Sequence, residues 1–505
     1  MSQWLCVIPG GRGSCRAVRN GRPRDHRGSA GASPSHNRET LLRTASVLLA
    51  ACVLNLFVAA ATMAGPPTAE GRFTVTLPPH RFAAELRPGS PFGINTALRP
   101  DQPDLEARLA AMQNAGIKWG RQDFGWGRIE HKPGQYDWEP YDRLVEACRK
   151  HGILLFGNLG YAPSFHDPRK PEGVAAYAAF AAAAAKHFSG KVDDWQIWNE
   201  PNGGYWKGTP DQYADLLAAA GKAIHQAAPH ARVLGLNMAF CDVLWAERIL
   251  KRVPYDCFDV ACFHPYRPPS APEDRFDWWT LDQYVKSWHR HDLTPTFPLV
   301  RMSFPEQTEE LVKVMQKHGK PKPIWITEIC WNTNIHPYGS SELRQADLLV
   351  RFHVLALAAG RVEKVFWWTL RDGGTRQFDM ADMVGLMRAD LSPKYSYYAF
   401  ARMTRMLEGR RWVRNDSFGP DVYAAVFTEE GSSEDLIVAW ANKPYAYVRV
   451  SNERGLTFYD VYGTRRFVPV DPVRTKNLPV PLGESPIYVV GAKGLKAVVR
   501  PDPGW

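Results

Sequence analysis

The chain has 505 residues, which is enough for one large domain and a smaller companion. Its formal charge is +10, and residues 1–64 supply +6 of this through eight Arg, no Lys, and only Asp25 and Glu39 in opposition. The rest of the chain carries +4 without a basic run, which argues against a nucleic-acid-binding protein. The 18 Trp, 19 Tyr and 23 Phe fit either a large core or rings that line a binding site.

The N-terminal 64 residues have the composition of an export signal. Residues 1–44 are rich in Gly, Ser, Pro and Arg, and we expect a disordered basic leader. Residues 45–64 hold an apolar run, preceded by Arg38 and Arg43, with an expected signal-peptide cleavage zone at residues 61–64. An uncleaved anchor and a bacterial lipoprotein box at Leu49-Ala50-Ala51-Cys52 are the alternatives. All three predict an exported bacterial protein (secreted, periplasmic or cell-surface), with membrane contact only through an uncleaved or lipidated segment.

Several chemistries are excluded by missing motifs. The chain has no CxxC pair, no HExxH, no GxSxG and no GxxxxGK[ST] string. This removes the zincin, serine hydrolase and P-loop classes, and we expect neither a metal nor an organic cofactor. Five of the eight cysteines follow residue 64, so at least one thiol is free, and a disulfide between Cys257 and Cys262 is not expected.

From residue 65 onward, apolar strands alternate with amphipathic helices. Eight strands are predicted at residues 92–95, 119–124, 154–160, 195–199, 233–238, 258–264, 324–329 and 365–370. Eight helices are predicted at residues 104–115, 140–151, 173–188, 210–228, 242–252, 306–318, 341–359 and 394–407. This alternation predicts a (β/α)₈ TIM barrel over residues 65–409. A doubly wound sheet is the rival, but Gly93-Ile94-Asn95 lacks the Gly-rich first turn typical of it.

The helical period disappears after about residue 410. Short strands are predicted at residues 422–427, 435–441, 445–450, 457–462 and 487–490, so residues 410–505 are interpreted as a small all-β sandwich. A strand from residues 71–78 is a candidate addition to it. The longest insertion in the barrel spans about 266–296 and contains Trp278, Trp279, Tyr284 and Trp288, which either shape a cleft or pack as a surface subdomain.

Two glutamates end two of the predicted barrel strands. Glu200 ends strand four and Glu328 ends strand seven. Since the carboxyl ends of barrel strands meet at one opening, these two carboxyl groups should face each other across it. Glycosidic bond cleavage needs such a pair, one carboxyl that donates a proton to the leaving oxygen and one carboxylate that attacks the anomeric carbon.

The two strand ends also carry a family resemblance. Trp198-Asn199-Glu200-Pro201-Asn202 and Trp325-Ile326-Thr327-Glu328 resemble the strand-four and strand-seven signatures of retaining glycoside hydrolases of clan A. Within this clan, the chain most resembles glycoside hydrolase family 39, the β-xylosidases and their relatives, and the resemblance covers about residues 90–408. The resemblance implies that Glu200 is the acid/base, that Glu328 is the nucleophile, and that Asn199 hydrogen-bonds the sugar 2-hydroxyl.

Further residues match positions that bind substrate in this clan. The resemblance implies a Tyr that hydrogen-bonds the nucleophile and a His that contacts the sugar, which are Tyr266 and His264 here. Arg121 resembles the clan's buried Arg under the nucleophile, and its pairing with Glu328 or with Asp123 stays open. Trp368, rather than Trp367, matches the platform under the sugar. Candidates for outer subsites are Trp126, Tyr161 and Trp206.

These observations lead to one main hypothesis and two alternatives. The main hypothesis is an exported retaining glycosidase that cleaves β-glycosidic bonds of poly- or oligosaccharides, with a carbohydrate as its partner. One alternative is a non-catalytic carbohydrate-binding surface protein on a degenerate barrel. The other is a transglycosylase, because a sugar hydroxyl and water compete for the same intermediate.

Overall fold

The computed structural model describes residues 75–275 and 302–499, apart from residues 337, 380, 419–420, 443–445, 452–454 and 469–477. The predicted leader and apolar segment at residues 1–64 lie outside the described residues, as do the four aromatic residues of the long insertion. Within the described ranges, no helix combines the length and the apolar character needed to cross a bilayer.

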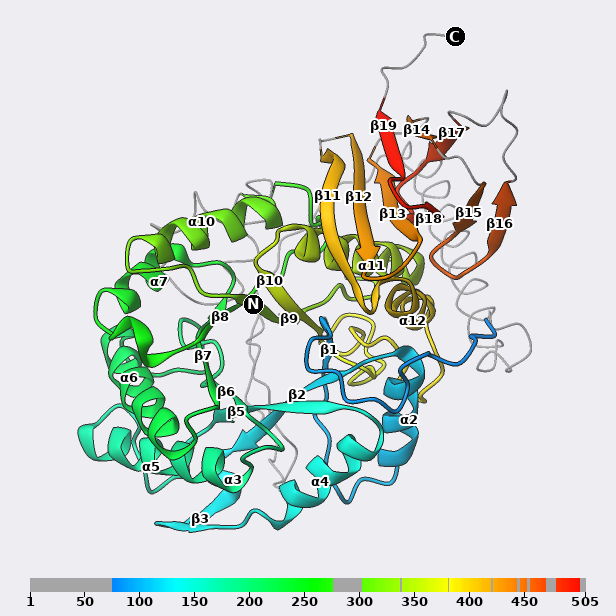
Figure 1. The fold of residues 1–505 in the computed structure, drawn as a ribbon. Helices are drawn as coiled ribbons and strands as arrows, with labels where there is room; N and C mark the ends of the chain where they lie inside the picture. The colour runs from blue at the N-terminus through cyan, green and yellow to red at the C-terminus, as the bar shows by residue number, and fades with distance from the viewer. Residues whose placement is uncertain are drawn as a thin grey trace, which may run out of the picture. The chain divides into compact units, whose positions relative to one another are not determined.

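Eight parallel strands close into a barrel in their chain order, as the alternation predicts (Figure 1). They are β1 (Phe92–Asn95), β2 (Trp119–Gly125), β5 (Leu154–Gly160), β6 (Asp194–Ile197), β7 (Arg232–Ala239), β8 (Val260–His264), β9 (Ile324–Ile329) and β10 (Val362–Trp367). Each predicted strand corresponds to one of these, with ends that differ by three residues at most.

Helices lie outside the strands and cover them (Figure 1). They are α2 (Leu105–Ala115), α4 (Glu139–Lys150), α5 (Pro171–His187), α6 (Pro210–Ala227), α7 (Val243–Leu250), α10 (Phe304–Gln316), α11 (Glu342–Ala358) and α12 (Tyr395–Leu407). Local signals set their ends. Gly116 stops α2 with a left-handed φ of 73°, and Thr209 begins α6 by accepting a hydrogen bond from the Gln212 amide.

Short elements that pattern reasoning did not predict interrupt the alternation. A single helical turn, α3 (Trp126–Ile129), and a small hairpin of β3 (Glu130–Lys132) and β4 (Gln135–Tyr136) follow β2, and a 3₁₀ turn, η1 (Tyr255–Cys257), precedes β8. These segments are too short to show a helical or strand period.

The lower half of the barrel interior is filled with apolar side chains. Its members are Trp119, Leu154, Phe156, Leu234, Val260, Cys262, Trp325 and Phe366. The amino-terminal end is closed by Leu86 and by Lys364, whose Nζ donates to the carbonyls of Pro88 and Ser90 at 2.6 and 3.1 Å. Polar chemistry is therefore confined to the opposite end, where the strands terminate.

Two antiparallel sheets after α12 form the predicted sandwich. The larger has the order β11 (Arg410–Phe418), β12 (Val422–Glu429), β13 (Glu434–Ala441), β18 (Ile487–Ala492), β15 (Leu456–Tyr459) and β16 (Arg465–Val468). The smaller has the order β17 (Leu478–Leu482), β14 (Ala446–Ser451) and β19 (Lys496–Val499). The four strands that the pattern missed, β11, β16, β17 and β19, are all sheet edges, where Arg, Lys and Pro are tolerated. Residues 75–78 form no strand, and residues 71–74 lie outside the description.

A buried ion pair connects the barrel to the sandwich. Arg351 of α11 makes two hydrogen bonds to the carboxylate of Glu273, at 2.8 and 2.9 Å, and the two side chains are 2% and 1% exposed. Glu273, on the loop after β8, also accepts from the indole of Trp440 at 2.6 Å, and Arg351 donates to Asn442 at 2.6 Å. The ring of Trp440 stacks on that of Tyr423. The loop that follows β8 is thus anchored to β13.

Glu273→Gln should destabilise the protein strongly, because it leaves the Arg351 guanidinium buried without its charge partner. We expect a loss of about 3–5 kcal/mol in the free energy of unfolding, measured by urea denaturation. Glu484→Gln is the matched control. Glu484 pairs at 2.5 Å with Arg344, which lies on α11 as Arg351 does, but both of these side chains are exposed. Its effect should stay below about 1 kcal/mol. Equal losses in the two variants would contradict this account.

Candidate active site

The end of β6 delivers Glu200 through a tight turn. Trp198 and Glu200 have positive φ values of 63° and 43°, in the left-handed region that large side chains rarely occupy. Pro201 prevents the strand from continuing, and the Gly203 amide donates to the Glu200 carbonyl at 2.7 Å. Asn202 ties the turn to β7 by hydrogen bonds to both the amide and the carbonyl of Ala239, at 2.8 and 2.9 Å. The Glu200 side chain is 3% exposed as a result of this folding.

An irregularity in β9 directs Glu328 into the barrel. Val365 of β10 pairs with Ile326 and Trp367 pairs with Ile329, so β9 advances three residues while β10 advances two. Strict alternation would point Glu328 away from the barrel interior that holds Trp325 and Thr327. The extra residue allows both Thr327 and Glu328 to reach the same interior group, His264. Pattern reasoning predicted the strand but not this bulge.

Glu328 is held by a buried ion pair. Arg121 Nη1 donates to Glu328 Oε1 at 2.6 Å, and the two side chains are 6% and 10% exposed. The hydroxyl of Tyr266 donates to the other oxygen, Oε2, at 2.5 Å. This geometry answers the open question about Arg121, which forms its salt bridge with Glu328 and none with Asp123. Tyr266 reaches Glu328 although β8 itself ends at His264.

His264 lies between the two glutamates. Its Nδ1 is 2.8 Å from Glu200 Oε1 and 3.6 Å from Glu328 Oε2, while its Nε2 is 2.9 Å from Thr327 Oγ1. One oxygen from each carboxyl group and a ring nitrogen of His264 all lie within 4.8 Å of one another. Such a set has the composition of a metal site. However, both Glu328 oxygens and both ring nitrogens already have protein hydrogen-bond partners, so the arrangement fits a proton-handling pair better.

Asn199 is positioned by the same arginine. Arg121 Nη2 donates to Asn199 Oδ1 at 2.6 Å, and the amide nitrogen of Asn199 makes no hydrogen bond to the described residues. Trp368 is half-buried, with its ring edge-on to Tyr266 at 6.3 Å, whereas Trp367 is fully buried and donates to the Val384 carbonyl. Of the two tryptophans, Trp368 is therefore the one on the side of the glutamates.

The two glutamates have opposite electrostatic environments. Burial raises the pKa of Glu200, and the neighbouring Glu328 charge raises it further, against the opposing influence of His264. Burial also acts to raise the pKa of Glu328, but the charges of His264 and Arg121 and the Tyr266 hydrogen bond outweigh it. The net pKa of Glu328 is lowered. The pKa values of the two carboxyl groups are therefore shifted in opposite directions, upward for Glu200 and downward for Glu328.

Sequence reasoning missed a polar network beneath the pair. Arg121 also donates to Gln196 at 3.1 Å and to Asn95 at 2.7 Å, and Asn95 donates in turn to the Thr327 carbonyl. Gln196 donates to Asn158 at 3.0 Å. The available signal was an amide side chain among apolar residues in each of three strands, as in Trp195-Gln196-Ile197, because a buried amide needs a partner.

Two of the expected outer-subsite aromatics are core residues. Trp126 is fully buried and stacks on His166 at 5.0 Å, and Trp206 is 5% exposed and packs edge-on against Trp198. Both tryptophans follow a strand in the sequence, which suggested a place at the barrel opening. In the structure, α3 turns Trp126 inward, and the turn after Glu200 turns Trp206 inward. Tyr161 is 36% exposed and remains a candidate. The five cysteines after residue 64 are all buried and free, so Cys257 and Cys262 form no disulfide.

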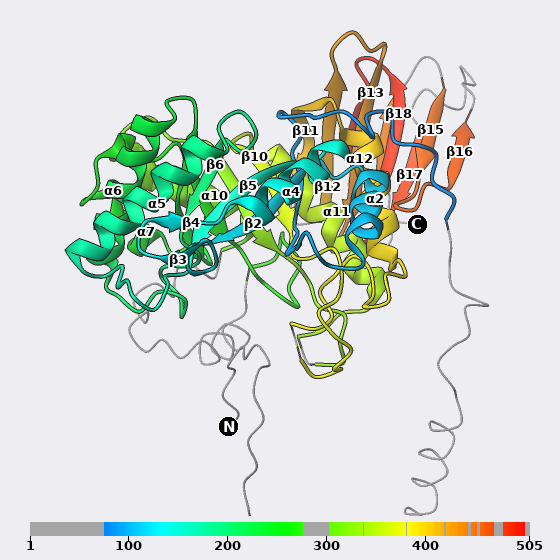
Figure 2. The ribbon, with the colours of Figure 1, turned by 90° about the horizontal axis from the view of Figure 1, so that it is seen from below.

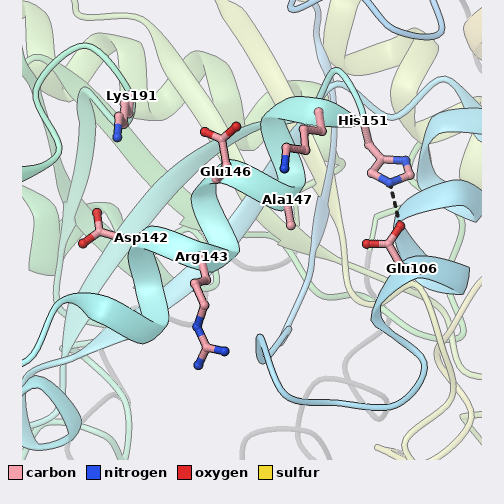
Figure 3. A pocket seen from close by; sticks show the side chains of 8 residues that line it. Glu106, Asp142, Arg143, Glu146, Ala147, His151 and Lys191 are labelled. Atoms are coloured by element: carbon pink, nitrogen blue, oxygen red, sulfur yellow. Dashed lines mark hydrogen bonds and ion pairs between the residues drawn. The ribbon is translucent and has the colours of Figure 1, made fainter.

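A concavity lies on the outside of the barrel (Figure 3). It has a volume of about 670 Å³ between α2 and α4, and its lining residues are Glu106, Asp142, Arg143, Glu146, Ala147, Lys150, His151 and Lys191. Acidic and basic groups alternate there, and the pair between His151 and Glu106 is 3.1 Å long with Glu106 79% exposed. This surface is solvated and far from the two glutamates in the fold, so it carries no candidate chemistry.

The chain is similar to known proteins in its structure. No family profile and no curated protein matches the sequence. The structure is similar to a family 39 glycoside hydrolase from Bacteroides cellulosilyticus, at 22% identity and a TM-score of 0.68 over 81% of this chain and 82% of that one. It is also similar to a family 39 β-xylosidase from Caulobacter crescentus (17%, 0.55, over 82% and 98%) and a family 30 endoxylanase from Clostridium papyrosolvens (11%, 0.53, over 81% and 98%). The chain shares the fold of these glycoside hydrolases.

The pH dependence of stability should report the opposite environments of the two glutamates. The raised pKa of Glu200 means that wild-type protein loses stability as pH rises from the unfolded pKa, about 4.3, toward the folded one. Glu200→Gln removes this loss, so its stability relative to wild type should increase with pH. The lowered pKa of Glu328 contributes stability that is lost as pH falls through the folded value. Glu328→Gln should therefore decrease in relative stability as pH rises.

Urea denaturation at a series of pH values measures both trends. Slopes of the same sign for the two variants would show that the two carboxyl groups do not differ as described.

Proposed function

We propose that the protein is an exported retaining glycoside hydrolase that cleaves β-glycosidic bonds of poly- or oligosaccharides by double displacement. The observation that carries the proposal is a pair of carboxyl groups with opposite pKa shifts, in which one oxygen of Glu200 lies within 4.8 Å of one oxygen of Glu328. Retaining enzymes hold these groups about 5–5.5 Å apart, whereas an inverting water needs about 6.5–9.5 Å. Export rests on residues 1–64 of the sequence alone.

We infer a role for each group in the first step. The Glu328 carboxylate attacks the anomeric carbon while Glu200 donates its proton to the glycosidic oxygen, so the bond from carbon to that oxygen breaks and a glycosyl ester forms on Glu328. Arg121 and Tyr266 keep Glu328 ionised and fix the direction of its oxygens. Asn199 offers its amide nitrogen to a hydroxyl next to the anomeric carbon, and Trp368 offers a ring face.

The second step reverses the roles. Glu200, now ionised, takes a proton from water, whose oxygen attacks the anomeric carbon and releases the Glu328 carboxylate. When a sugar hydroxyl replaces the water, the same step gives transglycosylation. A non-catalytic binding protein is disfavoured, because sugar binding alone does not require two carboxyl groups with opposite pKa shifts.

Removal of Glu328 should abolish turnover by eliminating the ester intermediate. We expect Glu328→Gly to reduce kcat on aryl β-glycosides by at least about 10⁴-fold. Azide should restore part of the activity and yield a glycosyl azide of inverted configuration, which NMR identifies. Glu310→Ala, on the surface of α10, is the matched control and should retain wild-type activity. Full activity of Glu328→Gly would end the assignment.

Activity should have a bell-shaped pH profile. It should fall at low pH as Glu328 becomes protonated and at high pH as Glu200 loses its proton. Tyr266→Phe removes a hydrogen bond that favours ionised Glu328, so the pKa of Glu328 should rise and the acidic limb should move to higher pH. The pH dependence of kcat/KM measures both limbs. An acidic limb that stays in place would remove Tyr266 from this role.

A further inference from the structure

Asp123 is an exposed carboxylate on an otherwise buried strand. It is the only exposed residue of β2, which is buried at its six other positions. Side chains alternate along a strand, so Asp123 shares the inward face of Arg121 and lies two residues nearer the open end of the barrel. Because Arg121 holds Glu328 and Asn199, this position borders the space above the two glutamates.

The side chain of Asp123 is oriented by the polar network described above. Asn158 Nδ2 donates to Asp123 Oδ1 at 2.7 Å, and Asn158 is fully buried. Asn158 is connected through Gln196 to Arg121. The second carboxylate oxygen of Asp123 makes no hydrogen bond to the described residues. Asp123 is thus fixed relative to Glu328 and retains hydrogen-bonding capacity toward the opening.

An exposed aromatic ring lies on the same side of the opening. Tyr161 directly follows β5, the neighbour of β2, and its ring is 5.9 Å from that of Trp198 and 6.0 Å from that of Tyr205. Tyr161 and Tyr205 are 36% and 46% exposed. Burial raises the pKa of Tyr161, and the negative charge of Asp123 adds to this, which agrees with the proximity of the two groups. A ring face beside a carboxylate suits a pyranose, which has an apolar face and a rim of hydroxyls.

We propose that Asp123 binds hydroxyl groups of the sugar at the cleaved bond and restricts the protein to glycosides whose sugar at that position is uncharged. This inference rests on the proposed function and adds the substrate class. An ionised carboxylate only accepts hydrogen bonds, so it matches hydroxyl donors. It repels a uronic acid, whose carboxylate would enter a space where, among the described residues, the carboxylates of Asp123 and Glu328 face the guanidinium of Arg121.

The test compares sugars that differ in one substituent. Aryl β-xyloside, β-glucoside and β-glucuronide share their ring hydroxyls and differ at C5. Aryl β-galactoside and β-galacturonide form a second set. Oligosaccharides of the same sugars are tested as well, in case the protein needs longer substrates. We expect wild-type kcat/KM to be at least about 100-fold higher for the best neutral glycoside than for its uronide. Asp123→Asn should lower kcat/KM on the neutral glycoside by about 10- to 100-fold and should reduce this ratio.

Asp142→Asn on the outer surface of α4 is the like-for-like control and should behave as wild type, with melting temperatures confirming that both variants fold (Figure 3). Asp123→Asn activity within about twofold of wild type, or a uronide cleaved as well as its neutral counterpart, would overturn the inference while glycoside cleavage itself stands. A wild-type protein that cleaves no glycoside in the panel would overturn the proposed function and this inference together.

Discussion

The buried ion pair between Arg121 and Glu328 is the interaction on which the rest of the site depends. A guanidinium inside a barrel is costly unless charge and hydrogen bonds compensate it, and here Glu328, Asn199, Gln196 and Asn95 do so together. The donor groups of Arg121, which lies on β2, therefore connect this strand to β1, β6 and β9 at one level of the barrel. Tyr266 contacts Glu328, which this arginine holds, and His264 connects Glu328 to Glu200.

The difference between the two glutamates follows from what surrounds each one. Both are buried, which by itself favours the neutral form of both. Only Glu328 has a guanidinium and a phenol hydroxyl on its oxygens, so only the pKa of Glu328 is lowered. Its charge then helps to keep the proton on Glu200. One ion pair thus gives two chemically identical side chains opposite pKa shifts.

Parts of the chain far from the glutamates stabilise the loops around them. The loop after β8, which carries Tyr266, is anchored at Glu273 by Arg351 and by Trp440 of the sandwich. The loops after β9 and β10 run side by side in Figure 2, where the Ile335 amide donates to the Gln377 carbonyl at 3.1 Å. Through Trp440, the sandwich therefore supports the loop after β8 at the barrel opening.

The sequence alone determined the order of elements and the two glutamates, because strand period, Gly stops and paired strand-end motifs are local properties. It also predicted Tyr266, His264 and Trp368 through the family resemblance. Only the tertiary structure decided which partner Arg121 takes, that the bulge in β9 turns Glu328 inward, and that Trp126 and Trp206 are core residues. It also revealed the exposed Asp123 and the edge strands of the sandwich. These features depend on contacts between residues distant in the chain, for which no local pattern exists.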